Sequence, residues 1–383
     1  MTVTAPRGFR AAGVAAGIKN SGKPDVAVVI NDGPSAAAAA VFTSNRVKAA
    51  PVRWSELAVA DGKVRAVVLN SGNANACTGP AGYHDTEQTA EHLAGLLRLG
   101  PADVAVCSTG LIGDRLPMHR LLAGVDAATL AATTQGGEAA AAAIMTTDTV
   151  PKTCKIESTG YTIGGMAKGA AMLAPALATM LVVLTTDADL AASDLDKALR
   201  AAVRTTFDRL DSDGCMSTND TVLLLASGAA EVQPDPDEFA GLLTRVCDNL
   251  AQQLLLDAEG ASKAISVQVV GAENEDDAVE VGRAVARSSL LKCAIHGEDP
   301  NWGRVLAAVG TTGAAFDADQ LNVAMNGIWV CQNGAQAQDR AAVDLSPRDV
   351  TITIDLSAGS AAACVRTTDL TAAYVHENSA YST

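Results

Sequence analysis

Short runs of apolar residues recur along the chain and are bounded by Gly, Asn, Asp or Ser. Many of these residues are β-branched, a pattern typical of buried strands. The pattern predicts strands at Val26 to Ile30, Val64 to Leu69, Val104 to Cys107, Met180 to Leu184, Thr221 to Ala226, Ala264 to Val270 and Thr351 to Asp355.

Apolar residues at helical spacing indicate helices between these strands. Ser193 and Asp196 fit a capping box in front of one such stretch. Asp235 followed by Pro236 marks the start of a second helix, which we expect to end near Leu256. A third is expected at about 276–288.

The order of strands and helices has no regular alternation. It therefore favours an α+β fold over a doubly wound parallel sheet. Two alanine-rich stretches, Ala36 to Ala40 and Ala139 to Ala143, interrupt the pattern. We expect them to be tightly packed helix or strand rather than tails.

Composition narrows the class of protein. The chain has 383 residues, of which 48% are apolar, so we expect two to three packing units with large cores. The formal net charge of −15 disfavours a nucleic-acid partner, because such a surface repels phosphates. Only 3% of the residues are aromatic, which leaves few platforms for base stacking.

Membrane and metal-binding classes are also disfavoured. The longest nearly apolar run, Ala170 to Leu184, is shorter than a bilayer span and contains Pro175. No convincing export signal precedes it. The eight cysteines include no C-x-x-C pair, which gives no local support for a zinc or redox site. We expect a cytoplasmic protein with reduced cysteines, without membrane attachment or bound metal.

Two other motifs carry little weight. Arg10 to Ala15 fits R-x-x-G-x-A, a coenzyme A pyrophosphate loop, but no strand is predicted before it, so we interpret it as a coincidence. None of the five histidines lies in a catalytic motif. A Ser-His-Asp triad distant in sequence stays open, whereas His296 more simply belongs to a hydrogen-bonded turn.

The most unusual segment joins an isolated lysine, Lys168, to Thr179 eleven positions later. Composition alone favours a buried strand in which the threonine hydroxyl is satisfied by the sheet. The alternative is a self-cleaving nucleophile. A break between Ala178 and Thr179 would leave an α-amino group, with an ordinary pKa of about 8, beside the hydroxyl as its general base.

Motifs spread over nearly the whole chain resemble the ornithine acetyltransferase family of arginine biosynthesis, also called bifunctional glutamate N-acetyltransferases. Besides the segment around Thr179, the matching stretches are residues 42–46, 51–52, 70–79, 108–113, 145–149, 257–261, 296–304 and 378–383.

The resemblance implies a set of catalytic residues. Thr179 becomes the nucleophile after scission of the Ala178–Thr179 bond. Thr109 and Gly110 form the oxyanion hole, one through its hydroxyl and one through its backbone N–H.

The resemblance also implies substrate-binding residues. Lys168 holds a substrate carboxylate. Thr146, Asn378 and Thr383 position the polar ends of the amino acid. Glu259 faces the substrate ammonium or moves its proton. Without the resemblance, Glu259 could be a solvated carboxylate at a helix end.

The implied fold is an αββα-type sandwich with a smaller C-terminal α/β lobe. The implied reaction moves an acetyl group from N2-acetyl-L-ornithine to L-glutamate through an acetyl-Thr179 ester. Fragments 1–178 and 179–383 are expected to assemble as a heterotetramer with two copies of each. No organic cofactor or metal is implied, and acetyl-coenzyme A is a co-substrate if the enzyme is bifunctional.

Two other functions stay open. An N-terminal-threonine amidase or aminopeptidase would share the nucleophile but hydrolyse its substrate. A non-catalytic protein that binds amino acids, or serves as an oligomeric scaffold, would never be cleaved.

Overall fold

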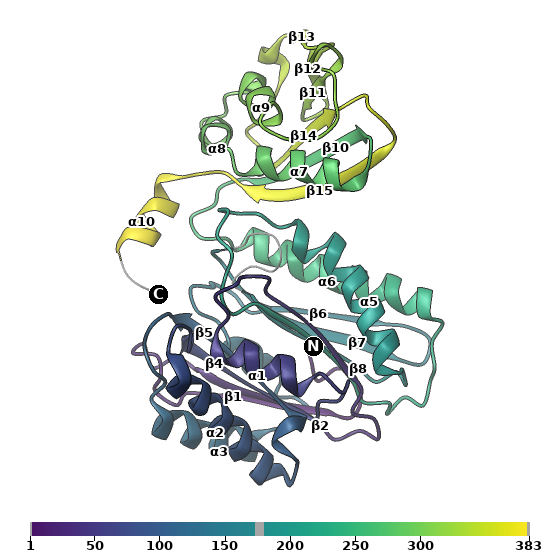
Figure 1. The fold of residues 1–383 in the computed structure, drawn as a ribbon. Helices are drawn as coiled ribbons and strands as arrows, with labels where there is room; N and C mark the ends of the chain where they lie inside the picture. Colours follow the sequence, from purple (N-terminus) through teal and green to yellow (C-terminus); the bar gives the residue numbers. More distant parts are fainter. Residues whose placement is uncertain (1, 173–179, 381–383) are drawn as a thin grey trace. The chain divides into compact units, whose positions relative to one another are not determined.

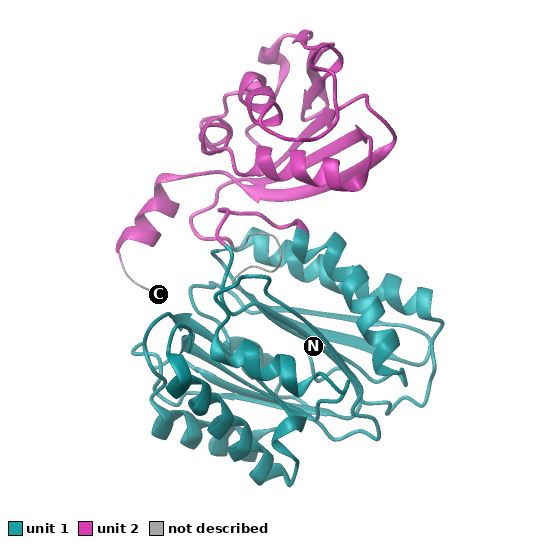
Figure 2. Ribbon diagram, viewed as in Figure 1, with its two compact units in different colours: residues 1–208, 216–257, 383 teal, residues 209–215, 258–382 magenta. Residues whose placement is uncertain are grey.

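The computed structural model describes residues 2–172 and 180–380 (Figure 1). They divide into two compact units (Figure 2). Unit 1 takes residues 2–172, 180–208 and 216–257, and unit 2 takes residues 209–215 and 258–380. Each unit has its own sheet or sheets and its own core. Two units agree with the expectation of two to three packing units.

The first sheet of unit 1 has four strands in the order β1-β2-β4-β5. Their bounds are Phe9–Val14 (β1), Val26–Asn31 (β2), Ala66–Asn73 (β4) and Val104–Leu111 (β5). β4 and β5 run parallel, and the other pairs are antiparallel. The R-x-x-G-x-A motif lies largely within β1, so it is not a phosphate-binding loop at the start of a helix.

The second sheet of unit 1 has five strands in the order β3-β9-β8-β7-β6. Their bounds are Ala38–Phe42 (β3), Lys152–Glu157 (β6), Thr162–Lys168 (β7), Leu181–Thr186 (β8) and Thr221–Ala226 (β9). β8 and β9 run parallel and are buried along their full length, which explains their continuous apolar sequence.

Six helices belong to unit 1. They are Ala50–Ala58 (α1), Gly79–Leu97 (α2), Met118–Ala131 (α3), Gly137–Ala143 (α4), Ala192–Thr205 (α5) and Pro236–Leu256 (α6). α2 and α3 supply apolar residues to a core cluster with the first sheet, while α5 packs against β3 and α6 against β6 and β7.

The two sheets of unit 1 face each other across a shared core. That core contains Leu69 and Cys107 from the first sheet and Val183 and Leu223 from the second. With helices on the outer face of each sheet, unit 1 is a four-layer αββα sandwich (Figure 1). The αββα fold expected from the resemblance is confirmed.

Unit 2 is built on one six-stranded sheet in the order β13-β12-β11-β14-β10-β15. The strands are Ala264–Ala272 (β10), Asn322–Met325 (β11), Ile328–Gln332 (β12), Ala335–Gln336 (β13), Asp349–Asp355 (β14) and Ala361–Thr368 (β15). The helices are Glu275–Ala286 (α7), Ser289–His296 (α8), Trp302–Val309 (α9) and Ala372–Ala380 (α10). This is the smaller α/β lobe.

All seven predicted strands are confirmed as β2, β4, β5, β8, β9, β10 and β14. The helix start at Asp235 is confirmed, because its carboxylate accepts the N–H groups of Asp237 and Glu238 at 3.0 Å. The two alanine-rich stretches become one strand, β3, and one helix, α4.

The predicted capping box at Ser193 and Asp196 is wrong. α5 begins at Ala192, and the residue that precedes it, Ala191, makes no side-chain cap. Ser193 therefore lies inside the first helical turn instead of at the extended capping position, where a hydroxyl reaches forward to the next N–H groups.

The predicted fragment boundary after Ala178 falls between β7 and β8. These strands are antiparallel neighbours, with Lys168 opposite Leu181. Cleavage there would leave the second sheet of unit 1 shared by both fragments. The fragment boundary itself stays a prediction.

Within the described ranges, no helix is long and apolar enough to cross a membrane.

Candidate active site

The predicted oxyanion residues lie at the end of β5. Thr109 is buried, and Gly110 has a φ of +128°, a conformation that side chains disfavour. A Cβ atom on Gly110 would lie 2.4 Å from the carbonyl carbon of Gly72 on the neighbouring strand β4. Glycine is therefore required at position 110, by its backbone conformation and by the close approach of two strands.

Lys168 is the last residue of β7, and the structure brings it to Thr109. Its side chain is only 1% exposed, and its ammonium donates a hydrogen bond to the Thr109 hydroxyl at 3.2 Å. Because the hydroxyl oxygen accepts from the lysine, the hydroxyl hydrogen is left to donate to another acceptor. This contact joins two predicted site residues that are 59 positions apart.

Asp148 connects this pair to the predicted residue Thr146. One carboxylate oxygen of Asp148 accepts the N–H of Gly169 at 2.7 Å, and the other accepts the N–H of Thr146 at 3.0 Å. Burial works to raise the pKa of Asp148, but the charges of Lys168 and Lys152, with the Gly169 N–H, outweigh burial and lower the pKa to about 2. Asp148 is thus an anion that orders the backbone beside Lys168.

Lys152 completes the buried charge network. Its side chain is fully buried and its ammonium bridges Asp148, at 2.6 Å, and Asp257. Asp257 follows the last residue of α6 and also accepts the N–H of Thr149 at 2.9 Å. The network therefore ties the 146–149 segment to the start of β6 and to the end of α6.

A second lysine reaches the same segment. The Lys19 ammonium donates to the carbonyl of Met145 at 2.9 Å. Burial lowers the pKa of Lys19, Asp25 opposes that effect, and the Lys168 charge adds to it. Lys19 is therefore close enough to Lys168 for their charges to interact.

Sequence reasoning assigned no role to Asp148, Lys152, Asp257 or Lys19. Asp148 and Asp257 lie in motifs that carry the family resemblance, but an isolated acidic residue in a sequence is usually solvated. The available signal was the four-residue spacing of Asp148 and Lys152, which is compatible with an ion pair without requiring one.

Glu259 and Asn378 lie together in unit 2. The Asn378 side-chain amide donates to the Glu259 carboxylate at 2.9 Å, and it also donates to the Tyr374 carbonyl within α10. Glu259 is half-buried in the loop after α6. Glu259 thus has a side-chain partner within unit 2, and its role in substrate binding stays a prediction.

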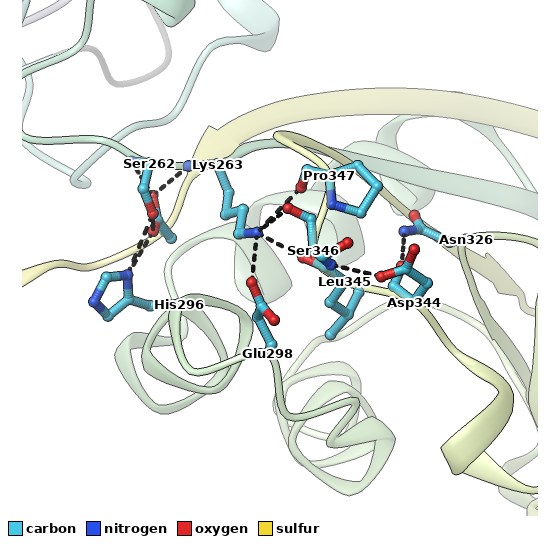
Figure 3. Close-up of polar contacts among 10 residues, drawn as sticks. Ser262, Lys263, His296, Glu298, Asn326, Asp344, Leu345, Ser346 and Pro347 are labelled. Carbon is cyan, nitrogen blue, oxygen red and sulfur yellow. Dashed lines mark hydrogen bonds and ion pairs between the residues drawn. The ribbon is translucent and has the colours of Figure 1, made fainter.

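The loop that carries Glu259 is fixed by Lys263 (Figure 3). Its ammonium donates to the carbonyls of Leu345 at 2.6 Å, Ser346 at 2.9 Å and Pro347 at 3.2 Å, and it pairs with Glu298. Four acceptors around one buried cation hold the start of β10 rigidly.

Asp369 anchors the other side of the same loop. It accepts the N–H groups of Ser262 and Lys263, each at 2.9 Å, together with the Ser262 hydroxyl and His296 Nδ1. In a Ser-His-Asp triad, serine and aspartate contact different nitrogens of the histidine. Here Ser262 and Asp369 both approach Nδ1, so this cluster is structural, as expected for His296.

The remaining predicted residues, Ala178, Thr179 and Thr383, lie outside the described part of the chain. The structure does describe Met180, which follows Thr179, and its N–H donates to Asp220. Among residues 2–172 and 180–380, no group of three or more His, Cys, Asp and Glu side chains is arranged to hold a metal ion.

The chain matches the ArgJ family over residues 10–383. It is 68% identical to the arginine biosynthesis bifunctional protein ArgJ of Thermobifida fusca over the full length of both chains. It is 57% identical to the protein of that name from Mycobacterium tuberculosis strain H37Rv, over 99% of this chain and 96% of that one.

Solved structures are similar as well. One is ornithine acetyltransferase from Mycobacterium tuberculosis in complex with ornithine, with 59% identity and a TM-score of 0.45 over 45% of this chain and 94% of that chain. Another is ArgJ from Bacillus halodurans, with 34% identity and a TM-score of 0.49 over 51% and 97%. On the strength of the family match and the full-length relatives, the chain belongs to the ArgJ family.

Proposed function

We propose that this chain cleaves itself before Thr179 and then transfers the acetyl group of N2-acetyl-L-ornithine to L-glutamate. Membership of the ArgJ family makes it an acetyltransferase of arginine biosynthesis. The observation that carries the site assignment is the contact between the buried Lys168 ammonium and the Thr109 hydroxyl, next to Gly110.

In the proposed reaction, the Thr179 hydroxyl attacks the acetyl carbonyl while the α-amino group of Thr179 takes its proton. The Thr109 hydroxyl and the Gly110 N–H stabilise the tetrahedral oxyanion, and loss of one such donor typically costs about 3 kcal/mol of barrier. The proton returns to the leaving amine, ornithine departs, and acetyl-Thr179 remains. The amino group of glutamate then attacks this ester, the bond to the Thr179 oxygen breaks, and the amine proton passes to that oxygen, which releases N-acetylglutamate and restores the hydroxyl.

Substrate binding is assigned to charged and polar residues. Lys168 holds a carboxylate, and its position beside Thr109 supports this role, because it keeps the bound group near the oxyanion donors. Thr146, Glu259, Asn378 and Thr383 are assigned to the remaining polar ends of the amino acid. The hydrogen bond from Asn378 to Glu259 is consistent with a shared role for these two residues.

The assembly and setting are also part of the proposal. Fragments 1–178 and 179–383 form a heterotetramer with two copies of each. Acetyl-coenzyme A serves as a second acetyl donor, since the full-length relatives are named bifunctional proteins. The compartment is the cytoplasm, which suits eight free cysteines.

Intact mass spectrometry tests the proposal directly. The purified protein should give two fragments that divide at 178/179, and brief exposure to N2-acetylornithine should add one acetyl group to the second fragment. Thr179→Ala should stay uncut and inactive. Thr185→Val is the matched control, because Thr185 is a buried threonine on β8 whose hydroxyl bonds only backbone carbonyls.

Two results contradict the proposal. One is fully active protein with a single intact mass. The other is free acetate released in proportion to substrate and unaffected by glutamate, which indicates hydrolysis by an amidase.

A further inference from the structure

Five consecutive polar residues lead into β9, and all are buried. Ser217 to Thr221 are each no more than 8% exposed. Such a run is unusual in a protein interior, where polar groups must find hydrogen-bond partners. The partners of the third residue, Asn219, lie at β4 and β5, and the partner of the fourth residue, Asp220, lies at the start of β8.

Asn219 holds the ends of β4 and β5. Its side-chain amide donates to the carbonyl of Ala74 at 2.6 Å and to the carbonyl of Ser108 at 2.9 Å. Its side-chain oxygen accepts the Thr218 hydroxyl at 2.6 Å, which fixes the orientation of the amide. Ser108 is the residue before Thr109, so Asn219 secures the backbone that presents the oxyanion donors.

Asp220 holds the start of β8. One of its carboxyl oxygens accepts the N–H of Met180 at 3.0 Å, and the other is buried as well. The Thr221 N–H also donates to the Met180 carbonyl at 3.2 Å. Met180 is therefore held at both of its backbone polar groups by adjacent residues of one segment.

The buried position of Asp220 also shifts its pKa. Burial raises the pKa of Asp220 well above its ordinary value, although the Met180 N–H opposes that effect. A carboxyl group can accept the Met180 N–H whether or not it carries a proton, so this contact does not depend on the charge of Asp220.

We propose that Asn219 and Asp220 are positioning residues that hold the oxyanion donors at 109–110 in register with Met180, the residue that follows the proposed nucleophile. The inference rests on the proposed function. Neither side chain needs to touch the reacting atoms, because Asn219 acts through the Ser108 carbonyl and Asp220 acts through the Met180 N–H.

The adjacency of the two residues is the reason for the proposal. Because they are neighbours in sequence, one peptide unit sets the spacing between the two strand ends. Reacting groups must meet within a few tenths of an ångström, and an error of about 1 Å costs about 100-fold in rate.

Substitutions at Asp220 separate positioning from chemistry. Asp220→Asn keeps an oxygen for the Met180 N–H in a side chain of the same shape. Asp220→Leu removes the acceptor at similar size. We expect Asp220→Asn to cleave itself and turn over within about threefold of wild type. Asp220→Leu should lose about 100-fold in cleavage rate and in kcat per cleaved chain, with KM within about twofold.

The experiment follows full-length protein by pulse-chase on a denaturing gel and then measures transfer kinetics per mole of cleaved chain. Asn219→Asp replaces two N–H donors with an acceptor that faces two carbonyls. Its cleavage rate and kcat should therefore decrease as those of Asp220→Leu do. The control is Ser227→Ala, a buried hydroxyl beyond the far end of β9 that donates to the Arg7 carbonyl. It should leave kcat and cleavage unchanged.

The outcomes separate this inference from the proposed function. Cleavage and turnover of Asp220→Leu at the wild-type level overturn the inference, and so does an Asp220→Asn variant as impaired as Asp220→Leu. If Asp220→Leu does not fold, Asn219→Asp decides: a reduced kcat with unchanged KM supports the inference and a normal kcat overturns it. Wild-type protein that neither cuts itself nor transfers acetyl defeats the proposed function instead.

Discussion

Replacement of Lys152 by Met tests how much the buried charge network stabilises unit 1. The substitution removes one ammonium from between two carboxylates, and the Lys152 side chain has no exposure to solvent that could compensate. Methionine approximates the volume of the lysine stem, so the core stays filled. What remains is Asp148, buried, with Lys168 and backbone N–H groups as its compensating partners.

Two estimates give the size of the effect. Removing one partner of a buried ion pair typically costs about 3–5 kcal/mol of the free energy of unfolding. Independently, the decrease in the pKa of Asp148 from 3.8 to about 2 corresponds to about 2 kcal/mol at neutral pH, and Lys152 supplies only part of it. We expect a loss of about 3 kcal/mol, or about 6–12 °C in melting temperature for a domain of about 150–250 residues.

Differential scanning calorimetry in a Thr179→Ala background measures this loss on a continuous chain. The control is Lys155→Met on the same strand β6, because Lys155 pairs with the largely exposed Glu157 and such pairs contribute about 0–1 kcal/mol. Equal melting temperatures for the two variants would refute the reasoning.

The same network predicts the acid response. Because the folded-state pKa of Asp148 is depressed, its stabilisation is present above pH 4 and is lost as the pH falls towards 2. Lys152→Met should lose less stability than wild type over that interval.

Two further substitutions test the site. Gly110→Ala should lower both self-cleavage and kcat by about 100-fold, because a Cβ atom would clash with Gly72. Gly113→Ala, which shares a positive φ but has open space around it, should show a much smaller decrease in the same gel and kinetic assays. Lys168→Met should raise the KM for N2-acetylornithine by about 10–100-fold in steady-state kinetics, since a hydrogen bond to a charged group is worth about 1.5–3 kcal/mol. A KM within twofold of wild type would show that Lys168 does not bind substrate.

The fold was predictable where local preference and burial agree. β2, β8 and β9 are continuous apolar runs that are fully buried. β7 was missed because it contains Gly164 and Gly165, residues that weaken a strand locally. The packing around β7 explains why glycine stands there, since a Cβ atom on Gly165 would lie 3.0 Å from the Leu250 side chain of α6. Tertiary packing therefore overrides local preference in β7.

The site was predictable only in part. The resemblance led to Thr109 and Lys168, which the structure brings together, but neither periodicity nor composition could pair residues so far apart. Asp148 and Asp257 are separated by about a hundred residues, and only the folded chain shows that one lysine bridges them. Asn219 and Asp220 were not predicted, because they bind backbone groups of distant segments, and backbone groups are the same for every residue type.

The strand order of the five-stranded sheet has a consequence for the processed protein. β8 and β9, which follow the predicted cut, lie between β3 on one side and β7 and β6 on the other, all of which precede it. The two pieces cannot diffuse apart until this interleaved sheet melts, so dissociation and unfolding become a single event. Dilution should then lower the thermal midpoint of the cut enzyme through mass action, and by more than it lowers the midpoint of an uncut chain, whose two halves stay covalently joined.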